Sequence, residues 1–423
     1  RSTKNGLSTI GDIQIGDEIW SEKGWTKVIN KWSTGIKDVY EYRTSGGVFY
    51  GTENHRLVSK GIKIEAKDCK SVDSLSGEYS DKPFEHDSQL IMDGLVIGDG
   101  MVHKASNNLI VLCIGANDND YFKSEIKDLI IKHREGIRPY AYEVLTNILP
   151  NELVRKYDIE IPERYLSLPK DKICSLLRGL YSANGSVIAN RITYKTSSKK
   201  LRDQIQLLLS YLGIDSYFTT NKTKNTKFDN GEYMTKESYD INITYDKDKF
   251  VKLIGFIQEY KNNKIVLNKK GRFINNRKVL TSKFISTEEV FDITVDNNTH
   301  TYWTGGLNVS NCGEIFMHED SCRLIHINLT SFIDNPFTDN ASINDERLYE
   351  ITYEAMRLGD DLVDLEADAI RKILAKIEND GDENNSEYKL YQRLLSHTLE
   401  GRRCGLGFTG LADMIAMLGL KYD

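Results

Sequence analysis

Asn311 and Cys312 are the two neighbouring residues of this chain with the most specific chemistry. An asparagine side-chain amide can attack its own backbone carbonyl carbon, which closes a succinimide ring and breaks the bond to the next residue. A cysteine at that next position supplies a thiol nucleophile. Because most Asn-Cys pairs are a turn asparagine before a buried cysteine, the prediction of a self-cleaving junction depends on the surrounding sequence.

Two further segments carry a second kind of chemistry. QLIMDGLVIGDG (89–100) and CSLLRGLYSANGSV (174–187) each predict a helix with small residues on one side, ending in an acid or amide followed by glycine. We expect the helices to pack through Gly94 and Gly179, which would aim Asp99 and Asn184 into one shared site. Two carboxylates there would hold divalent cations against phosphates, whereas an amide ligates Mg²⁺ only weakly.

The segments around these residues differ in their predicted secondary structure. Residues 1–88 alternate short β-type runs with turns at 16–17, 21–24 and 46–47, and residues 281–311 return to the same style with strands on either side of a turn at 296–298. These two β parts are expected to pair across the segment between them. Residues 348–377 are apolar at helical spacing.

Charge divides the chain in a similar way. The net charge is −6, yet residues 190–283 carry 20 Lys+Arg against 9 Asp+Glu, net +11, and residues 312–423 carry 11 against 22, net −11. The basic stretch interleaves Tyr and Asn, which suits a β-ribbon lying on phosphates, although most lysine-rich stretches are solvated surface. Nucleic-acid contact is not expected in the acidic segment.

The composition limits where in the cell the protein can be and what it can bind. No run approaches the roughly 20 apolar residues of a membrane span, and there is no signal core, so we expect a cytoplasmic protein without a membrane partner. Six cysteines without CxxC spacing predict reduced thiols and no zinc site. Because the chain opens at Arg1 and its first methionine is Met92, we expect a fragment of a longer precursor.

Four ordered motifs resemble those of inteins, the self-splicing proteins with a Hint-type fold. They are GLSTIGDIQIGDEIW, GTENHRL, VFDITVDNNTHTYW and GGLNVSNC. The resemblance implies that His55, supported by Thr52, protonates the departing amide nitrogen at the upstream scissile bond. It assigns Asp292 and His300 to the penultimate motif, Asn311 as the cyclising residue and Cys312 as the acceptor of the thioester exchange. Splicing needs no cofactor.

Two departures from the intein pattern bear on activity. The family usually has histidine before the terminal asparagine, where this chain has Ser310. Cyclisation is therefore expected to depend on His300. The family's first residue, a cysteine or serine nucleophile, would precede Arg1 and follow an upstream extein. Residues 1–423 alone are therefore expected to cleave after Asn311 without the initial acyl shift.

The two helical segments resemble the paired motifs of LAGLIDADG homing endonucleases of the DOD type. IEIPERYLSLP and TSSKKLRDQIQLLLSYLGIDSYF resemble further parts of that family. The resemblance implies Mg²⁺ held by Asp99 and double-stranded DNA at the insertion site as partner. Asn184 departs from the family's second catalytic acid, so an inactive or strand-biased nuclease that keeps its DNA surface is as well supported as an active one.

The segments CGEIFMHEDSCRLIHINLTSF and GRRCGLGFTGLADMIAMLGLKYD resemble ribonucleotide reductase, in the style of its adenosylcobalamin-dependent class. The resemblance implies that Cys312 forms the thiyl radical, Glu314 is the base for the ribose 3′ hydroxyl, and Cys322 is one of two reducing thiols. The mature enzyme would take a ribonucleotide, a thiol reductant and adenosylcobalamin. Cys404 has no such match, and we expect it in a glycine-rich turn.

The predicted architecture is multidomain. An all-β Hint splicing domain, 1–88 and 281–311, is interrupted by an α+β LAGLIDADG domain, 89–280, and followed by a mainly helical fragment of the reductase α/β barrel, 312–423. Three hypotheses compete: a self-splicing reductase precursor, a mobile endonuclease or DNA-binding element with impaired cleavage, and a decayed remnant that no longer splices.

Overall fold

The protein is described here from a computed structural model. The structure describes residues 2–4, 6–82, 84–103, 109–134, 140–153, 157–228, 231–268, 271–310, 322–381 and 385–422. The chain divides into two compact units, Arg1–Gly313 and Glu314–Asp423.

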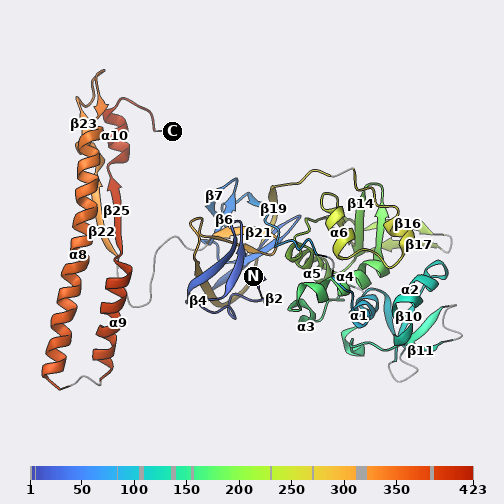
Figure 1. The fold of residues 1–423 in the computed structure, drawn as a ribbon. Coiled ribbons are helices and arrows are strands. Elements are labelled where there is room, and N and C mark those ends of the chain that lie inside the picture. The colour runs from blue at the N-terminus through green and yellow to red at the C-terminus, as the bar shows by residue number, and fades with distance from the viewer. Residues whose placement is uncertain are drawn as a thin grey trace. The chain divides into compact units, whose positions relative to one another are not determined.

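The first unit contains a β-rich part built from both ends of its sequence (Figure 1). Its strands are β1 Ser2–Thr3, β2 Gly6–Leu7, β3 Glu18–Ser21, β4 Gly24–Thr44, β5 Val48–Gly51, β6 Arg56–Ser59, β7 Ile62–Glu65, β8 Ser71–Asp73, β19 Asn276–Val295, β20 Thr301–Thr304 and β21 Leu307–Ser310. β4 and β19 pair antiparallel from Val28 opposite Val295 to Thr44 opposite Val279. The expected pairing of the two β parts across the intervening segment is therefore confirmed.

These strands are longer than their sequence suggests. β4 runs through 21 residues and β19 through 20, where the turn signals predicted several short strands. Gly35, at φ +87°, lies inside β4 opposite Val290, next to an irregularity in the ladder. A glycine tolerates this conformation, so the strand bends without ending. β19 also passes without a break through positions 280 and 281, the predicted start of the second β part.

A smaller antiparallel sheet, in the order β20-β21-β6-β7, lies within the same β-rich part. The core formed by the β-rich strands includes Ile19, Tyr42, Leu57, Tyr302 and Val309, each at most 1% exposed. Alternating burial along β3 and the first residues of β4 fits strands with one face on this core.

The rest of the first unit is an α/β part with two similar halves. α1 Ser88–Asp99 precedes a sheet ordered β11-β12-β10-β9, and α4 Lys170–Asn184 precedes a sheet ordered β13-β14-β18-β15. The strands are β9 Gly100–His103, β10 Leu109–Cys113, β11 Ile130–His133, β12 Ala141–Val144, β13 Gly185–Ile188, β14 Arg191–Thr196, β15 Tyr217–Asn221 and β18 Ser238–Ile243, with a separate hairpin of β16 Lys224–Phe228 and β17 Gly231–Thr235. Further helices are α2 Asn119–Ile126, α3 Glu163–Leu166, α5 Lys199–Tyr211, α6 Lys247–Leu253 and α7 Glu259–Asn262.

Side-chain caps fix where two of these helices begin. The Asp87 carboxylate accepts hydrogen bonds from the backbone N–H groups of Gln89 and Leu90 at the start of α1. Ser198 accepts one from the Leu201 N–H at the start of α5. Such caps satisfy donors that have no partner within the helix, so the chain enters α1 and α5 at defined residues.

The second unit contains two long helices and a parallel strand pair. Its elements are β22 Arg323–Asn328, β23 Ile333–Asp334, β24 Ser342–Ile343, α8 Asp345–Asn379, α9 Ser386–Gly401, β25 Cys404–Thr409 and α10 Leu411–Met417. β22 and β25 pair in parallel. The predicted helix over 348–377 is confirmed by α8, whose buried residues Gly359, Val363, Ala367, Ile370 and Leu374 recur at helical spacing. Cys404 begins β25 and is half-buried, in a strand where a turn was expected.

No helix among the described residues is long and apolar enough to cross a membrane.

Candidate functional site

The hairpin of β20 and β21 leads directly into the predicted cleavage junction. All four residues of each strand are buried, and the two strands are joined by Gly305 and Gly306 at φ +53° and +88°. A Cβ on Gly305 would overlap the Val48 carbonyl oxygen. Because both glycines hold left-handed conformations and Gly305 packs against backbone, this turn excludes larger residues and fixes the path toward Ser310.

His55 approaches the same strand from the other side. β6 and β21 pair antiparallel with Leu57 opposite Val309. Continuing that register sets Ser310 beside Arg56, one residue from His55. The His55 ring stacks on Phe49 with ring centroids 4.9 Å apart, and its backbone N–H donates to the Thr52 carbonyl at 3.2 Å. The predicted pair Thr52 and His55 thus forms one turn at the edge of β6.

His300 lies on the opposite flank of Ser310. Its backbone is left-handed, φ +50°, and its side chain is exposed. The fully buried Ser310 hydroxyl donates to the His300 carbonyl oxygen at 3.2 Å, while Ser310 pairs with Thr301 in the hairpin. The turn predicted at 296–298 is confirmed, and Ser310 helps to hold its far end.

Asp292 is 3% exposed in β19, where it pairs with Trp32. Its carboxylate accepts a hydrogen bond from the Ile293 N–H at 2.8 Å. This bond holds the carboxylate against its own strand, so Asp292 is placed by β19 and its ladder with β4. Asn311, Cys312 and Glu314 lie outside the described residues.

The close approach of α1 and α4 is confirmed. A Cβ on Gly94 would overlap the Leu176 carbonyl oxygen and lie 3.1 Å from the Gly179 Cα, and one on Gly179 would overlap the Ile91 carbonyl oxygen. Glycine is therefore required at both positions for the helix backbones to meet.

The two helix ends present different groups. Asp99 and Asn184 are both exposed, each one residue before the glycine that begins β9 or β13. The Asn184 amide donates to the Gly98 carbonyl oxygen across the helix pair at 2.7 Å. An ionised carboxylate has no proton to donate, so an aspartate at this position could not make the same bond.

Lys261 and Asp93 are polar residues near this helix pair that the sequence did not single out. Lys261 donates to the carbonyl oxygens of Ser182 and Gly185 at 3.2 and 3.0 Å. Burial lowers the pKa of its ammonium, against the opposing charges of Asp118 and Asp99. Asp93 is fully buried and accepts from Gln89, Thr146, Asn147 and Tyr165.

Asp93 could have been found from the sequence, because it is an acid within an apolar helical stretch. A buried acid needs hydrogen-bond partners, so such a position predicts a polar network. Lys261 could not have been found in this way, since it joins the site only through tertiary folding.

Few of the described side chains near the helix ends could ligate a metal ion. Within the described ranges, no group of three or more His, Cys, Asp or Glu side chains gathers in a way that could hold a metal ion. At the helix ends, Asp99 offers a carboxylate, whereas the Asn184 nitrogen faces a carbonyl oxygen. These donors fit one carboxylate-bound cation, and they do not fit a symmetric pair of cations.

Exposed lysines accompany the two sheets of the α/β part. Lys132 lies on β11 and Lys195 on β14, and Lys222, Lys224 and Lys236 lie on or beside β15, β16 and β17. Cationic side chains of this kind neutralise phosphates without reading bases. These side chains therefore offer exposed positive charge on or beside the strands of the α/β part.

In the second unit, Cys322 is exposed and directly precedes β22. The next residue, Arg323, is 8% exposed, pairs with Glu366 of α8 at 2.5 Å, and donates to the Thr398 hydroxyl of α9 at 3.3 Å. Burial raises the pKa of the Cys404 thiol. The start of β22 is thus anchored to both long helices, with Cys322 at its edge.

Comparison with known families identifies two parts of the chain. Residues 171–255 match the family model of the LAGLIDADG-like domain, and residues 290–423 match that of the ribonucleotide reductase barrel domain. The first match includes residues 171–184 of α4, and so Asn184. These matches agree with the resemblance to a LAGLIDADG endonuclease and to a ribonucleotide reductase.

Among curated proteins, the ATP-dependent DNA helicase Hel308 of Methanocaldococcus jannaschii is 28% identical over 219 residues, 47% of this chain and 18% of the helicase. The DNA polymerase of Thermococcus hydrothermalis is 26% identical over 258 residues, 53% of this chain and 15% of the polymerase. The chain thus spans less than a fifth of the length of these relatives.

Two solved structures are similar in part. The gp41-1 intein aligns with 18% of this chain and 62% of its own, at 23% identity and TM-score 0.17. A single-residue variant of the homing endonuclease I-DmoI, in complex with its target DNA, aligns with 40% of this chain and 93% of its own, at 20% identity and TM-score 0.26.

Proposed function

We propose that the chain is part of a ribonucleotide reductase precursor whose intein excises itself by protein splicing. The observation that carries this proposal is the placement of Ser310, the last described residue before the junction. Its hydroxyl bonds to the backbone of His300, and the register of β21 with β6 sets it one residue from His55. Residues of two separate motifs therefore flank β21, the strand that precedes Asn311 and Cys312 in the sequence.

The proposed cleavage step balances without a cofactor. The Asn311 side-chain nitrogen attacks the Asn311 carbonyl carbon, the bond from that carbon to the Cys312 nitrogen breaks, and the nitrogen leaves with a proton as a free amine. A nearby histidine can supply or relay that proton. His55 acts at the upstream scissile bond in the complete splicing reaction, Asp292 supports the penultimate motif, and Cys312 accepts the upstream extein.

The curated relatives support an inserted element. A helicase and a polymerase differ in activity, yet a short portion of each aligns with about half of this chain. Sequence shared by small parts of otherwise different proteins is expected when the shared part is not responsible for the activity of either. We therefore assign residues 1–88 and 281–311 to a splicing domain and 89–280 to a nested endonuclease.

The nested domain is proposed to bind double-stranded DNA and to cleave it poorly. The LAGLIDADG-like match and the exposed lysines support binding. Asp99 would hold Mg²⁺, which neutralises phosphate charge when bound, whereas Asn184 binds Gly98 and supplies no second carboxylate. A mobile DNA-binding element with impaired cleavage is the second candidate function.

In the mature reductase, Cys312 would serve again as the thiyl radical, with Glu314 as base and Cys322 as a reducing thiol. The barrel-domain match supports the enzyme class. Adenosylcobalamin, the ribonucleotide substrate and the thiol reductant remain predictions that rest on the resemblance. Reductase activity in an uncleaved Asn311→Ala precursor would contradict this double use of Cys312.

Intact-mass analysis of the expressed chain tests the proposal. We expect a fragment that begins at Cys312, and we expect Asn311→Ala to abolish it. Asn308→Ala, a change within β21, should retain detectable cleavage. If the fragment is absent from a folded chain fitted with an upstream cysteine-led strand, the element is a decayed remnant.

A further inference from the structure

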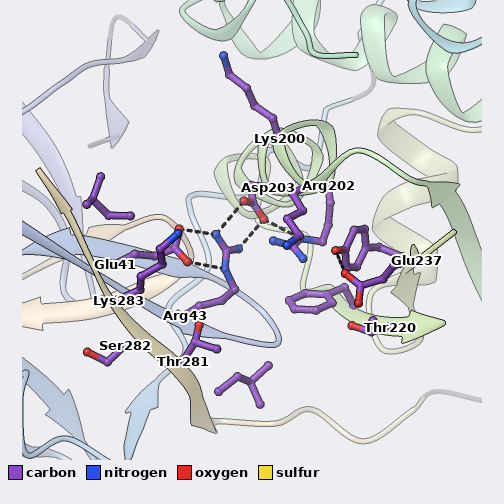
Figure 2. A pocket seen from close by; sticks show the side chains of 15 residues that line it. Glu41, Arg43, Lys200, Arg202, Asp203, Thr220, Glu237, Thr281, Ser282 and Lys283 are labelled. Carbon is purple, nitrogen blue, oxygen red and sulfur yellow. Dashed lines mark hydrogen bonds and ion pairs between the residues drawn. The ribbon is translucent and has the colours of Figure 1, made fainter. Parts of the chain in front are cut away.

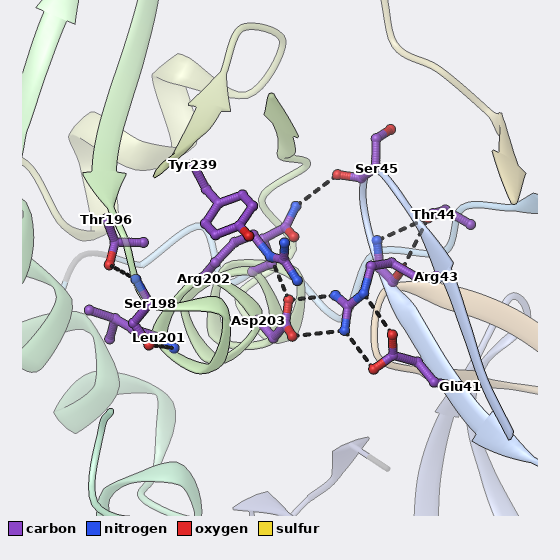
Figure 3. Close-up of polar contacts among 12 residues, drawn as sticks. Glu41, Arg43, Thr44, Ser45, Thr196, Ser198, Leu201, Arg202, Asp203 and Tyr239 are labelled. Atoms are coloured by element: carbon purple, nitrogen blue, oxygen red, sulfur yellow. Dashed lines mark hydrogen bonds and ion pairs between the residues drawn. The ribbon is translucent and has the colours of Figure 1, made fainter. Parts of the chain in front are cut away.

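A polar network joins the β-rich part of the first unit to α5 of the inserted α/β part (Figure 3). Arg43 of β4 is 9% exposed, and its guanidinium donates to both carboxylate oxygens of Asp203 at 2.5 and 2.9 Å. The same guanidinium binds Glu41 at 3.0 and 2.8 Å. Asp203 also accepts from Arg202 at 2.8 Å. Four alternating charges therefore cross from one part to the other, and each charge has an opposite neighbour.

Arg202 fixes the α5 side of this network. Its guanidinium carbon lies 4.3 Å from the Phe218 ring centroid and 4.4 Å from that of Tyr239, and the residue is 4% exposed. Cation–π contacts of this kind are stronger when water is excluded. The network lines a cleft of about 780 Å³ whose other walls include Thr281 and Lys283 of β19 (Figure 2).

A second ion pair holds the far end of α5. Asp215 follows the helix, and Arg277 of β19 donates to its two carboxylate oxygens at 2.7 and 2.9 Å. Arg277 also donates to the Ser74 and Ser45 hydroxyls at 3.1 and 3.3 Å and is 3% exposed. Because Asp203 lies near the start of α5, ion pairs to the β-rich part hold both ends of this helix.

The hairpin before the junction contacts α5 directly. Trp303 of β20 is 1% exposed, and its indole N–H donates to the Ser210 hydroxyl of α5 at 3.0 Å. Trp303 packs with the core of the α/β part, whereas Tyr302 and Val309 pack with the core of the β-rich part. The Ser210 carbonyl also accepts from the Gly77 N–H at 2.7 Å. The hairpin is therefore shared between two cores.

We propose that α5 of the inserted part is a positioning element for cleavage at the Asn311-Cys312 junction. It acts through Trp303 and Ser210, with Asp203 and Asp215 holding the helix against β4 and β19. The inference rests on the proposed cleavage after Asn311. It assigns the inserted part a role in self-excision, in addition to DNA binding.

The first test uses Trp303→Phe, Ser210→Ala and the double variant in the full chain. Loss of one buried hydrogen bond should increase amide hydrogen exchange at residues 301–310 roughly fivefold to tenfold. The cleavage rate should fall by a similar factor. The double variant should match the more affected single variant, because both changes remove the same bond. Trp25→Phe, which removes an indole N–H bound to Glu78, is the matched control and should leave both quantities unchanged.

The second test loosens α5 without touching the hairpin. Asp203→Asn and Asp215→Asn should each accelerate exchange at 301–310 and slow cleavage, while Asp158→Asn, an exposed acid of the same part, should change neither. These two variants keep the proposal testable if Trp303→Phe fails to fold.

The outcomes separate the two proposals. Unchanged exchange in folded Trp303→Phe, Asp203→Asn and Asp215→Asn would overturn the inference. Faster exchange with unchanged cleavage would overturn it as well, because positioning would then be irrelevant to the reaction. If the chain does not cleave even when fitted with an upstream cysteine-led strand, the proposed function fails, and exchange at 301–310 alone decides whether α5 holds the hairpin.

Discussion

The ends of α1 and α4 occupy equivalent places in two similar halves, yet they carry different chemistry. Each helix is followed by a glycine that begins a strand, and Gly94 and Gly179 meet where the helices cross. Asp99 ends one helix, and Asn184 ends the other with its amide bound to Gly98. The comparison teaches that a packing pattern can be retained in full while one residue changes what the site can bind.

The residues just before the two contact glycines also differ in chemistry between the two helices. Asp93 is buried and holds the segment around Thr146 and Asn147. Arg178 donates to the Ile254 carbonyl at 3.0 Å and to Glu125 at 3.0 Å. The same position of the motif therefore carries an acid in α1 and a base in α4, and each of the two anchors a different segment.

The largest effect is expected from breaking the feature that both helices share. Gly94→Val would place side-chain atoms on the Leu176 carbonyl, so the helices must separate or the domain must unfold. We expect a loss of about 3 kcal/mol or more in the free energy of unfolding, measured by urea denaturation. Gly115→Ala is the control, because a Cβ there meets only the Asp118 carboxylate at 3.9 Å. Equal stabilities of the two variants would contradict the packing argument.

Asp93→Ala should come next. It removes a buried carboxylate and leaves donors from Thr146, Asn147 and Tyr165 without their acceptor. The expected loss is about 2 to 3 kcal/mol, again by urea denaturation. Asp158→Ala removes an exposed acid and should cost little. A loss for Asp93→Ala no larger than that control would show that its hydrogen bonds add no net stability.

Arg178→Met, at the equivalent position of α4, should cost less. Its side chain is 16% exposed, so water can replace part of the hydrogen bonding that the Glu125 carboxylate and the Ile254 carbonyl lose. About 1 to 2 kcal/mol is expected by the same measurement. A cost above that of Asp93→Ala would reverse the order inferred from burial.

Asn184→Asp sharpens the comparison at the helix ends. A carboxylate cannot donate to Gly98, and it lies near Asp99, so we expect a loss of about 1 kcal/mol without Mg²⁺. Added Mg²⁺ should raise the melting temperature of this variant more than that of the unsubstituted chain, because only the variant offers two carboxylates.

Mg²⁺-dependent cleavage of DNA carrying the intein-less insertion site should be much faster in Asn184→Asp than in the unsubstituted chain. Full Mg²⁺-dependent cleavage by the unsubstituted chain would refute the assignment of Asn184 as the defect.

Local patterns predicted much of this arrangement. The glycine contact of α1 with α4, the pairing of the β parts and the helix α8 were all visible in residue spacing. The length of β4 was not, because Gly35 and its neighbours read as a turn unless the partner strand is known. The Asn184 bond to Gly98 and the Trp303 bond to Ser210 join residues far apart in sequence, and single-sequence patterns do not encode such pairs.

The measurement that tests the central claim most directly is the mass of the fragment that ends at Asn311. Cyclisation leaves a carboxy-terminal succinimide, so a freshly formed fragment should be one water molecule lighter than a fragment with a free terminal asparagine. The account predicts this lighter species, together with a partner fragment that begins at Cys312, and predicts neither species in Asn311→Ala. A fragment that carries only the full asparagine mass from its first appearance, or one that persists in Asn311→Ala, would identify proteolysis and contradict self-excision.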